Sequence, residues 1–173
     1  MNKAEKSLLV SLIRHGEKRF FASDPGLTEL GQKQALTLGQ DLAQQFQINS
    51  AQYQLNNYRL LASPKRRTQE TAQILAKKLQ LTSHIDPFLD VEHQLSINRS
   101  KQQSWLKHFQ AQRLKQPTLR HILAVTHSQN IRYYWHLLGG PAVAIKDIEE
   151  CGIWTINIES KNWHFIDGVG EIN

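Results

Sequence analysis

The segment Ser7 to Gly16 reads SLLVSLIRHG, an apolar run followed at once by an arginine, a histidine and a glycine. The apolar part, Ser7 to Ile13, has the length and composition of a buried strand. Apolar residues in Leu27 to Phe46 then recur at helical spacing, which predicts an amphipathic helix. Strand, loop and helix therefore follow one another, with a charged side chain and an imidazole in the loop directly after the strand.

The same alternation recurs along the chain. We expect a strand over Tyr58 to Ala62 and a helix over Pro64 to Leu79, with Ser63 as the N-cap. A further strand over His121 to Thr126 precedes a helix that runs to Leu138. The other expected elements are a short strand over Ser83 to Asp86, a loop over Pro87 to Arg99, a helix over Ser100 to Lys115 that buries Trp105 and Phe109, and hairpin strands over Gly152 to Ile158 and Trp163 to Ile166. This pattern predicts the α/β class with a mostly parallel sheet.

Length and charge limit the kinds of function. The 173 residues show no internal repeat or linker, so we expect one domain over residues 1–173, with a polar arm at Met1 to Lys6. The formal net charge of +6 favours anionic partners. The lysines and arginines are scattered, apart from Lys65 to Arg67, and no aromatic-basic motif accompanies them. We therefore do not expect nucleic-acid binding.

The sole cysteine, Cys151, excludes an intramolecular disulfide and favours a reducing compartment. The apolar run Ser7 to Ile13 follows two lysines as in a short signal peptide, but it ends at Arg14 and His15 without a cleavage site. No stretch approaches the roughly 18–20 apolar residues of a membrane span. We expect a soluble, cytoplasmic protein that makes no membrane contact.

Three of the expected strands end in cationic or imidazole groups. These ends are Arg14 to Gly16, Ser63 to Arg67, and His127 with Ser128. Ligands of open α/β sheets bind beyond the carboxyl ends of the strands, and helix N-termini point to the same place. A single histidine at such a position is more often structural. Three such ends together predict a pocket for a tetrahedral anion, and so phosphate chemistry.

Four ordered motifs sharpen this expectation. They are LIRHGE from Leu12 to Glu17, DPGLTELG from Asp24 to Gly31, SPKRRTQETA from Ser63 to Ala72, and VTH from Val125 to His127. With these motifs the chain resembles the histidine phosphatase superfamily, which includes cofactor-dependent phosphoglycerate mutases and small bacterial phosphohistidine phosphatases. The resemblance implies a phosphoglycerate mutase-like fold, a three-layer α/β/α sandwich around a mostly parallel sheet.

The resemblance also implies roles for the residues in these motifs. His15 would be the nucleophile, Arg14 and Arg67 would clamp the phosphate, and His127 would donate to the transferring group. The residue types suit these roles, because a neutral imidazole is nucleophilic near pH 7 without a metal, and guanidinium groups stabilise the charge of the equatorial oxygens. The backbone N–H of Ser128, at a helix start, adds a further donor.

The general acid stays open at this point. The resemblance favours Glu92, but Asp90 and Asp86 lie in the same region, and the glycine- and tryptophan-containing stretch that usually follows the acid is absent. Asp90 as the acid, or a site without a dedicated acid, are the alternatives. A second departure from the family pattern is the loop after the nucleophile, where Lys18 and Arg19 occupy the place of an asparagine. These two cations either bind phosphate or are solvated.

The sequence thus predicts a metal-independent phosphatase without a cofactor, acting on a small phosphomonoester or on phosphohistidine in a protein. The acidic residues near the expected site show no metal-ligand pattern. One alternative is a non-catalytic module that binds a phosphorylated ligand. A mutase is a weaker alternative, because 173 residues leave little room for a lid over a bisphosphate. The physiological substrate and the oligomeric state stay undetermined.

Overall fold

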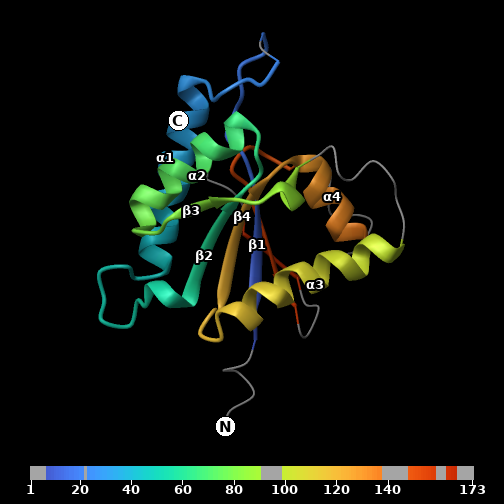
Figure 1. Ribbon diagram of the computed structural model, residues 1–173. Coiled ribbons are helices and arrows are strands. Elements are labelled where there is room, and N and C mark those ends of the chain that lie inside the picture. The colour runs from blue at the N-terminus through green and yellow to red at the C-terminus, as the bar shows by residue number, and fades with distance from the viewer. Residues whose placement is uncertain (1–6, 22, 91–98, 138–147, 159–162, 167–173) are drawn as a thin grey trace.

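The strands of the computed structural model, which describes residues 7–21, 23–90, 99–137, 148–158 and 163–166, form one sheet (Figure 1). Within these residues the order of the six strands is β3-β2-β4-β1-β5-β6. Their bounds are β1 Leu9–Arg14, β2 Tyr58–Ala62, β3 Ser83–Ile85, β4 His121–Thr126, β5 Ile153–Asn157 and β6 Trp163–Ile166. The first four strands run parallel, whereas β5 and β6 are antiparallel to their neighbours. The predicted α/β class and mostly parallel sheet are confirmed.

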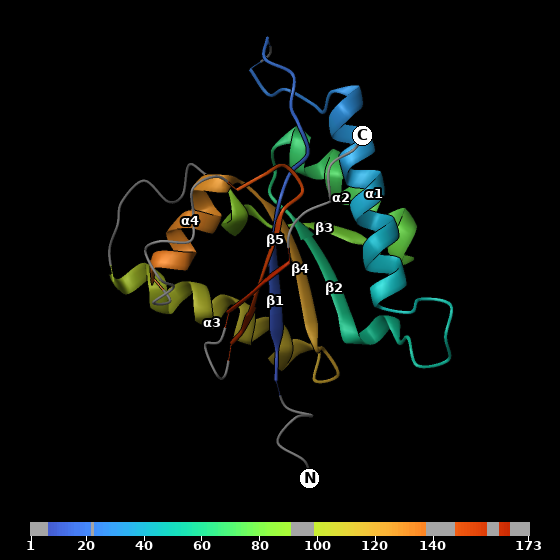
Figure 2. The same cartoon turned by 180° about the vertical axis from the view of Figure 1, so that it is seen from behind.

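Helices cover both faces of this sheet. α1 (Glu29–Gln45) and α2 (Arg66–Leu79) lie on one face, and α3 (Arg99–Lys115) and α4 (Ser128–Leu137) on the other (Figures 1 and 2). Two short 3-10 helices, η2 (Leu55–Asn57) and η3 (Pro87–Leu89), precede β2 and follow β3. This is the expected three-layer sandwich.

The apolar character of β1 follows from its place between two cores. Leu12 packs in the cluster on the α3/α4 side, and its neighbour Ile13 packs in the cluster on the α1/α2 side. In β2, Leu61 likewise packs in the cluster on the α3/α4 side, and Leu60 packs in the cluster on the α1/α2 side. Strands covered on both faces bury successive side chains, so they read as continuous apolar runs rather than alternating ones.

The start of α2 differs from the prediction. The helix begins at Arg66 and not at Pro64, and Ser63 is not its N-cap. The Ser63 hydroxyl lies instead 3.0 Å from His127 Nε2. The helix N-terminus is capped by the Asp24 carboxylate, whose two oxygens both lie 3.1 Å from the Arg66 backbone N–H. A carboxylate from a distant loop satisfies the orphan donor that a local hydroxyl was expected to satisfy.

Other expectations have mixed outcomes. Phe109 is buried as expected, whereas the side chain of Trp105 and the arm Met1 to Lys6 lie outside the described residues. The pairing of β5 with β6 confirms the terminal hairpin. Among the described residues, no helix has both the length and the apolar character needed to cross a membrane.

Candidate functional site

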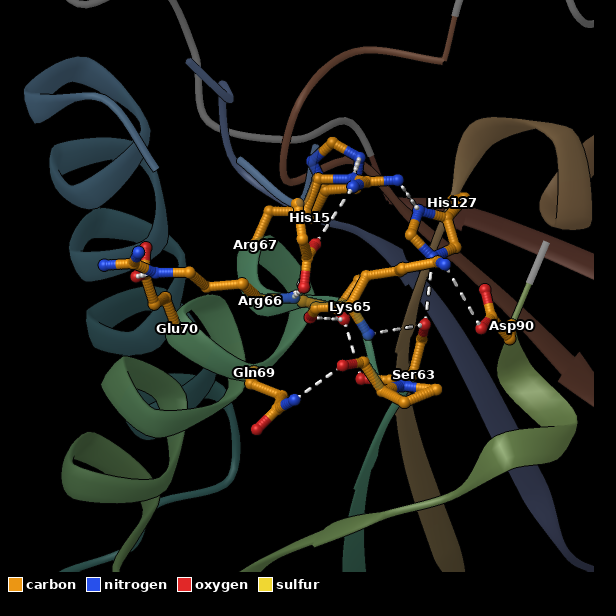
Figure 3. Close-up of polar contacts among 12 residues, drawn as sticks. His15, Ser63, Lys65, Arg66, Arg67, Gln69, Glu70, Asp90 and His127 are labelled. Carbon is orange, nitrogen blue, oxygen red and sulfur yellow. Dashed lines mark hydrogen bonds and ion pairs between the residues drawn. The ribbon is translucent and has the colours of Figure 1, made fainter. Parts of the chain in front are cut away.

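The three strand ends singled out in the sequence lie side by side. β2, β4 and β1 are consecutive in the sheet, and the register pairs Ala62 with Val125 and Arg14 with Thr126, so the strands end almost level. The residues that follow these ends therefore share one edge of the sheet. Figure 3 shows His15, Arg67, His127 and Ser63 gathered there.

The hydrogen bonds of His15 define its tautomer. Its Nδ1 lies 2.7 Å from the Gly16 carbonyl oxygen, which can only accept, so Nδ1 carries the proton. Its Nε2 accepts a hydrogen bond of 3.1 Å from Arg67 Nε. The backbone N–H of His15 donates to the Thr126 carbonyl at 3.1 Å and fixes the residue to β4. The lone pair of the ring is therefore on Nε2, directed at Arg67.

Burial lowers the pKa of His15 to about 4. The hydrogen bond to Gly16 opposes this shift, and the positive charges of Arg67, Arg14 and Lys18 add to it. The side chain is 6% exposed. His15 is therefore a neutral imidazole near pH 7, with an available lone pair.

His127 has the opposite tautomer. Arg67 Nη2 lies 3.2 Å from His127 Nδ1, and since a guanidinium only donates, Nδ1 accepts and Nε2 donates to Ser63 Oγ. The two imidazole rings lie edge to face with their centroids 5.3 Å apart. Burial lowers the pKa of His127 to about 2, and the charges of Arg67, His15 and Lys65 contribute. Both histidines are thus neutral in the unliganded protein.

Arg67 joins the two histidines. Its guanidinium binds both rings, and its Nη1 lies 3.8 Å from Asp24 Oδ1. The neighbouring cation Arg66 points the other way, toward Glu70 at 2.7 Å (Figure 3). The first turn of α2 therefore presents one arginine to the site and one to the surface.

Arg14 is anchored by a segment that the sequence did not connect with it. Its Nη1 donates to the Ile148 carbonyl and its Nη2 to the Glu150 carboxylate. Its Nε is buried and lacks a hydrogen-bond partner among the described residues. The charge of Arg14 acts on His15, which follows it in the chain. Glu150 was not among the predicted site residues.

A lysine and a carboxylate complete the described site. Lys65 Nζ lies 3.7 Å from Asp90 Oδ2, next to His127 in Figure 3. Asp90 Oδ1 is buried, and no described residue provides it with a hydrogen bond. Lys65 could have been found from the sequence, since it belongs to the cationic run after β2. The ion pair brings Asp90, one of the candidate acids, to the site.

The remaining predicted residues have the following positions. Asp86 caps η3 through the Phe88 N–H at 3.0 Å and binds His108 Nε2 at 2.6 Å. Burial would raise the pKa of Asp86, but these hydrogen bonds outweigh it and hold the pKa below its usual value. Glu92 lies outside the described residues. Ser128 is the first residue of α4, as expected.

The two cations after the nucleophile differ from one another. Lys18 is half-buried, contributes to the lowered pKa of His15, and has its Nζ 5.8 Å from the centre of the Phe20 ring. Arg19 is exposed, and its Nε donates to the Leu27 carbonyl at 3.1 Å. Arg19 therefore stabilises the loop, whereas the charge of Lys18 reaches the site.

Nothing in the described part of the chain resembles a metal site, because no three histidine, cysteine, aspartate or glutamate side chains gather there. The site instead combines two neutral imidazoles with four nearby cations, Arg14, Arg67, Lys65 and Lys18. Such a combination attracts an anion and offers it both donors and a nucleophile.

Comparison with known proteins agrees with this chemistry. Residues 10–94 match the histidine phosphatase superfamily, branch 1. Over these residues the chain is similar to this superfamily. Its sequence has no match among curated proteins.

Several solved structures share the fold. The protein histidine phosphatase SixA complexed with tungstate is 19% identical, with 92% of this chain and 94% of that chain covered and a TM-score of 0.64. A mycobacterial glucosyl-3-phosphoglycerate phosphatase is 15% identical, with 95% and 100% covered and a TM-score of 0.63. A protein named mycobacterial hydrolase 1 is 14% identical, with 95% and 100% covered and a TM-score of 0.68. At these identities the similarity establishes the fold.

Proposed function

We propose that this protein is a metal-independent phosphatase that hydrolyses a phosphomonoester, or phosphohistidine in a protein, through a phosphohistidine intermediate on His15. The observation that carries the proposal is the state of His15. Its Nδ1 proton is held by the Gly16 carbonyl, its lone pair is on Nε2, and its lowered pKa keeps the ring neutral. A neutral imidazole in this tautomer is an activated nucleophile without a metal.

In the first step, His15 Nε2 attacks phosphorus and the bond to the leaving group breaks. Arg67 Nε, which donates to Nε2 in the unliganded protein, must then turn to a phosphoryl oxygen. Arg14 keeps an N–H at Nε for the same group. Charge spread over the equatorial oxygens is stabilised by these prepositioned guanidinium groups.

His127 has to change tautomer before it can donate a hydrogen bond to the phosphoryl group. In the unliganded protein its Nδ1 is an acceptor from Arg67. When Arg67 moves to the phosphate, a proton on Nδ1 would let His127 donate to a phosphoryl oxygen. The Ser63 hydroxyl permits this, because it can accept from Nε2–H or donate to a bare Nε2. Ser63 thus supports both states of the ring.

The leaving oxygen needs a proton when it belongs to an alkyl alcohol. We assign this proton to Glu92, with Asp90 as the alternative. In the second step water attacks the phosphohistidine, the P–N bond breaks, His15 is regenerated with its lone pair, and the proton of the water returns to the carboxylate. Orthophosphate leaves with no net change in the protein.

The relatives support a phosphatase of this type. Two of the similar structures are named as phosphatases, one for protein histidine and one for glucosyl-3-phosphoglycerate. The named substrates differ widely, so they do not favour one substrate class for this chain.

The test is turnover of p-nitrophenyl phosphate together with trapping of the intermediate. We expect turnover, and an acid-labile, base-stable phosphoryl group on the protein after rapid quenching. His15→Ala should abolish both while the circular dichroism spectrum stays unchanged. Phosphate binding without turnover would support the binding module instead, and full activity in a folded His15→Ala variant would refute the mechanism.

The proposal also predicts independence from metal ions. Exhaustive treatment with EDTA should leave the activity unchanged, because the cationic pocket repels divalent ions. Loss of activity with EDTA and its recovery with magnesium would contradict this part of the proposal.

A further inference from the structure

The turn before β5 is attached to the end of β1 by its backbone. The Arg14 backbone N–H donates to the Gly152 carbonyl, and the Cys151 N–H donates to the Arg14 carbonyl, each at 3.1 Å. Within the turn, the Gly152 N–H donates to the Glu149 carbonyl at 3.0 Å. This places residues 148–152 directly beside the residue that precedes His15.

The conformation of this turn is fixed from inside. Cys151 has φ of 62°, a left-handed conformation that non-glycine residues rarely adopt. Its side chain is fully buried and packs in the same core cluster as Ile13 and Ile153. A conformation of this kind persists only where the surroundings determine it. The turn is therefore a rigid support rather than a loose loop.

A backbone carbonyl and a carboxylate extend this support to the Arg14 guanidinium. The Ile148 carbonyl and the Glu150 carboxylate hold its two terminal nitrogens. The Arg14 and Glu150 side chains are 23% and 31% exposed, so solvent only partly screens the pair. The Nε that remains is buried without a described partner. An unpaired buried donor destabilises the protein, and a hydrogen bond to a ligand oxygen would remove this cost.

We propose that Glu150 is a positioning residue for the phosphatase reaction, which holds Arg14 so that its free N–H meets the phosphoryl group. Glu150 acts through Arg14 and does not itself touch the substrate. This inference rests on the proposed function. The competing explanation is an ion pair that only stabilises the fold, and partly exposed pairs of that kind contribute little to stability.

A matched pair of variants separates the two explanations. Glu150→Gln keeps the shape and removes the charge. Glu149→Gln makes the same change in the adjacent exposed residue, whose backbone carbonyl accepts the hydrogen bond within the turn. We expect kcat/KM on p-nitrophenyl phosphate to fall about 10-fold in Glu150→Gln, less than the roughly 10²-fold for losing a donor outright. Inhibition by vanadate should weaken by the same factor. Glu149→Gln should change neither quantity.

A double-mutant cycle with Arg14→Met tests whether Glu150 acts through Arg14. In that background Glu150→Gln should cause no further loss, since the group that it positions is gone. An undiminished second loss, or equal behaviour of the two glutamine variants, would overturn the inference. Circular dichroism checks the fold, and Glu150→Asp enters the same cycle if Glu150→Gln does not fold.

The positioning role of Glu150 can be tested even if the protein is not a phosphatase. In a wild-type protein that does not turn over p-nitrophenyl phosphate, calorimetric titration with inorganic phosphate replaces the kinetic assay. Glu150→Gln should then weaken phosphate binding, and Glu149→Gln should not. Equal binding by both variants would refute the positioning role independently of catalysis.

Discussion

One strand carries an imidazole at each end of the sheet, and the two differ in their surroundings. His121 is the first residue of β4, and His127 directly follows its last residue. Burial lowers the pKa of both rings, to about 4 for His121 and about 2 for His127. Only the shift of His127 includes contributions from nearby cations, with Arg67 and Lys65 among them. A lowered pKa by itself therefore does not mark a functional histidine.

The partners of His121 are neutral. Its Nε2 lies 2.7 Å from Ser11 Oγ, which in turn lies 2.6 Å from Thr155 Oγ1. Its ring packs against Phe46 and Tyr58, with centroids 5.3 and 6.1 Å away. This histidine belongs to a hydrogen-bonded aromatic cluster, whereas His127 lies among charged groups that attract an anion. The difference predicts which variants lose activity and which lose stability.

The largest expected difference is between His127→Gln and His121→Gln. At the site end, kcat/KM on p-nitrophenyl phosphate should fall about 10²–10³-fold, the usual effect of removing a transition-state donor. At the other end, activity should stay within about 3-fold, while the free energy of unfolding falls by about 1–3 kcal/mol because the partly buried hydrogen bond to Ser11 is lost. Enzyme assays and urea denaturation measure the two effects. A large loss of activity in His121→Gln, or unchanged activity in His127→Gln, would contradict the distinction between the two histidines.

We expect a general acid at the His127 end of the sheet, where the site lies, and none at the His121 end. Glu92→Gln should lower the rate on an alkyl phosphate about 10²-fold and have a much smaller effect on p-nitrophenyl phosphate, whose leaving group needs no proton. Asp90→Asn serves as the parallel variant. If only Asp90→Asn shows the dependence on leaving group, Asp90 is the acid. Equal losses on both substrates would mean that Glu92 shapes the pocket instead.

A smaller effect is expected for the hydroxyl partner of each imidazole. Ser63→Ala should lower kcat about 5-fold, because one neutral hydrogen bond contributes about 1 kcal/mol and His127 then lacks its partner in both tautomers. Ser11→Ala removes the equivalent partner of His121 and should change stability but not kcat. Steady-state kinetics of the two variants provides the comparison.

A further expected effect is the pH dependence of stability. Unfolded His121 has its ordinary pKa of 6.5, whereas its pKa in the folded protein is about 4. Between these values the unfolded state binds more protons, so stability falls as the pH drops from 6.5 toward 4 and changes no further below that. His121→Gln lacks this contribution. Its stability deficit against wild type at pH 7 should therefore shrink by about 1–2 kcal/mol at pH 5, as measured by urea denaturation.

The elements that the sequence predicted best are those whose pattern is local. The strands Tyr58–Ala62 and His121–Thr126 match residue for residue, because most of their residues form buried apolar runs. The gathering of His15, Arg67 and His127 also followed from the sequence, since the ends of parallel strands share an edge. Their roles in a reaction stay predictions.

What the sequence missed depends on contacts between distant segments. Ser63 has the composition of an N-cap, but the Asp24 carboxylate caps α2 instead. Glu150 gave no signal, because it lies 136 positions from Arg14 and meets it only since β5 pairs with β1. The apolar pattern of a strand predicts that the strand exists, but it does not predict which other strands lie beside it in the sheet.

The place of β1 in the sheet has a consequence for how the protein is made. β1 pairs with β4 on one side and β5 on the other, and both partners come from the second half of the chain. During synthesis β1 leaves the ribosome first, yet its two edges stay unpaired until the later strands emerge. Unpaired edges of an apolar strand invite wrong pairing with other chains. The residues that hold Arg14 are thus joined last, and a nascent chain that stops before β5 contains the nucleophile without the support of its neighbour Arg14.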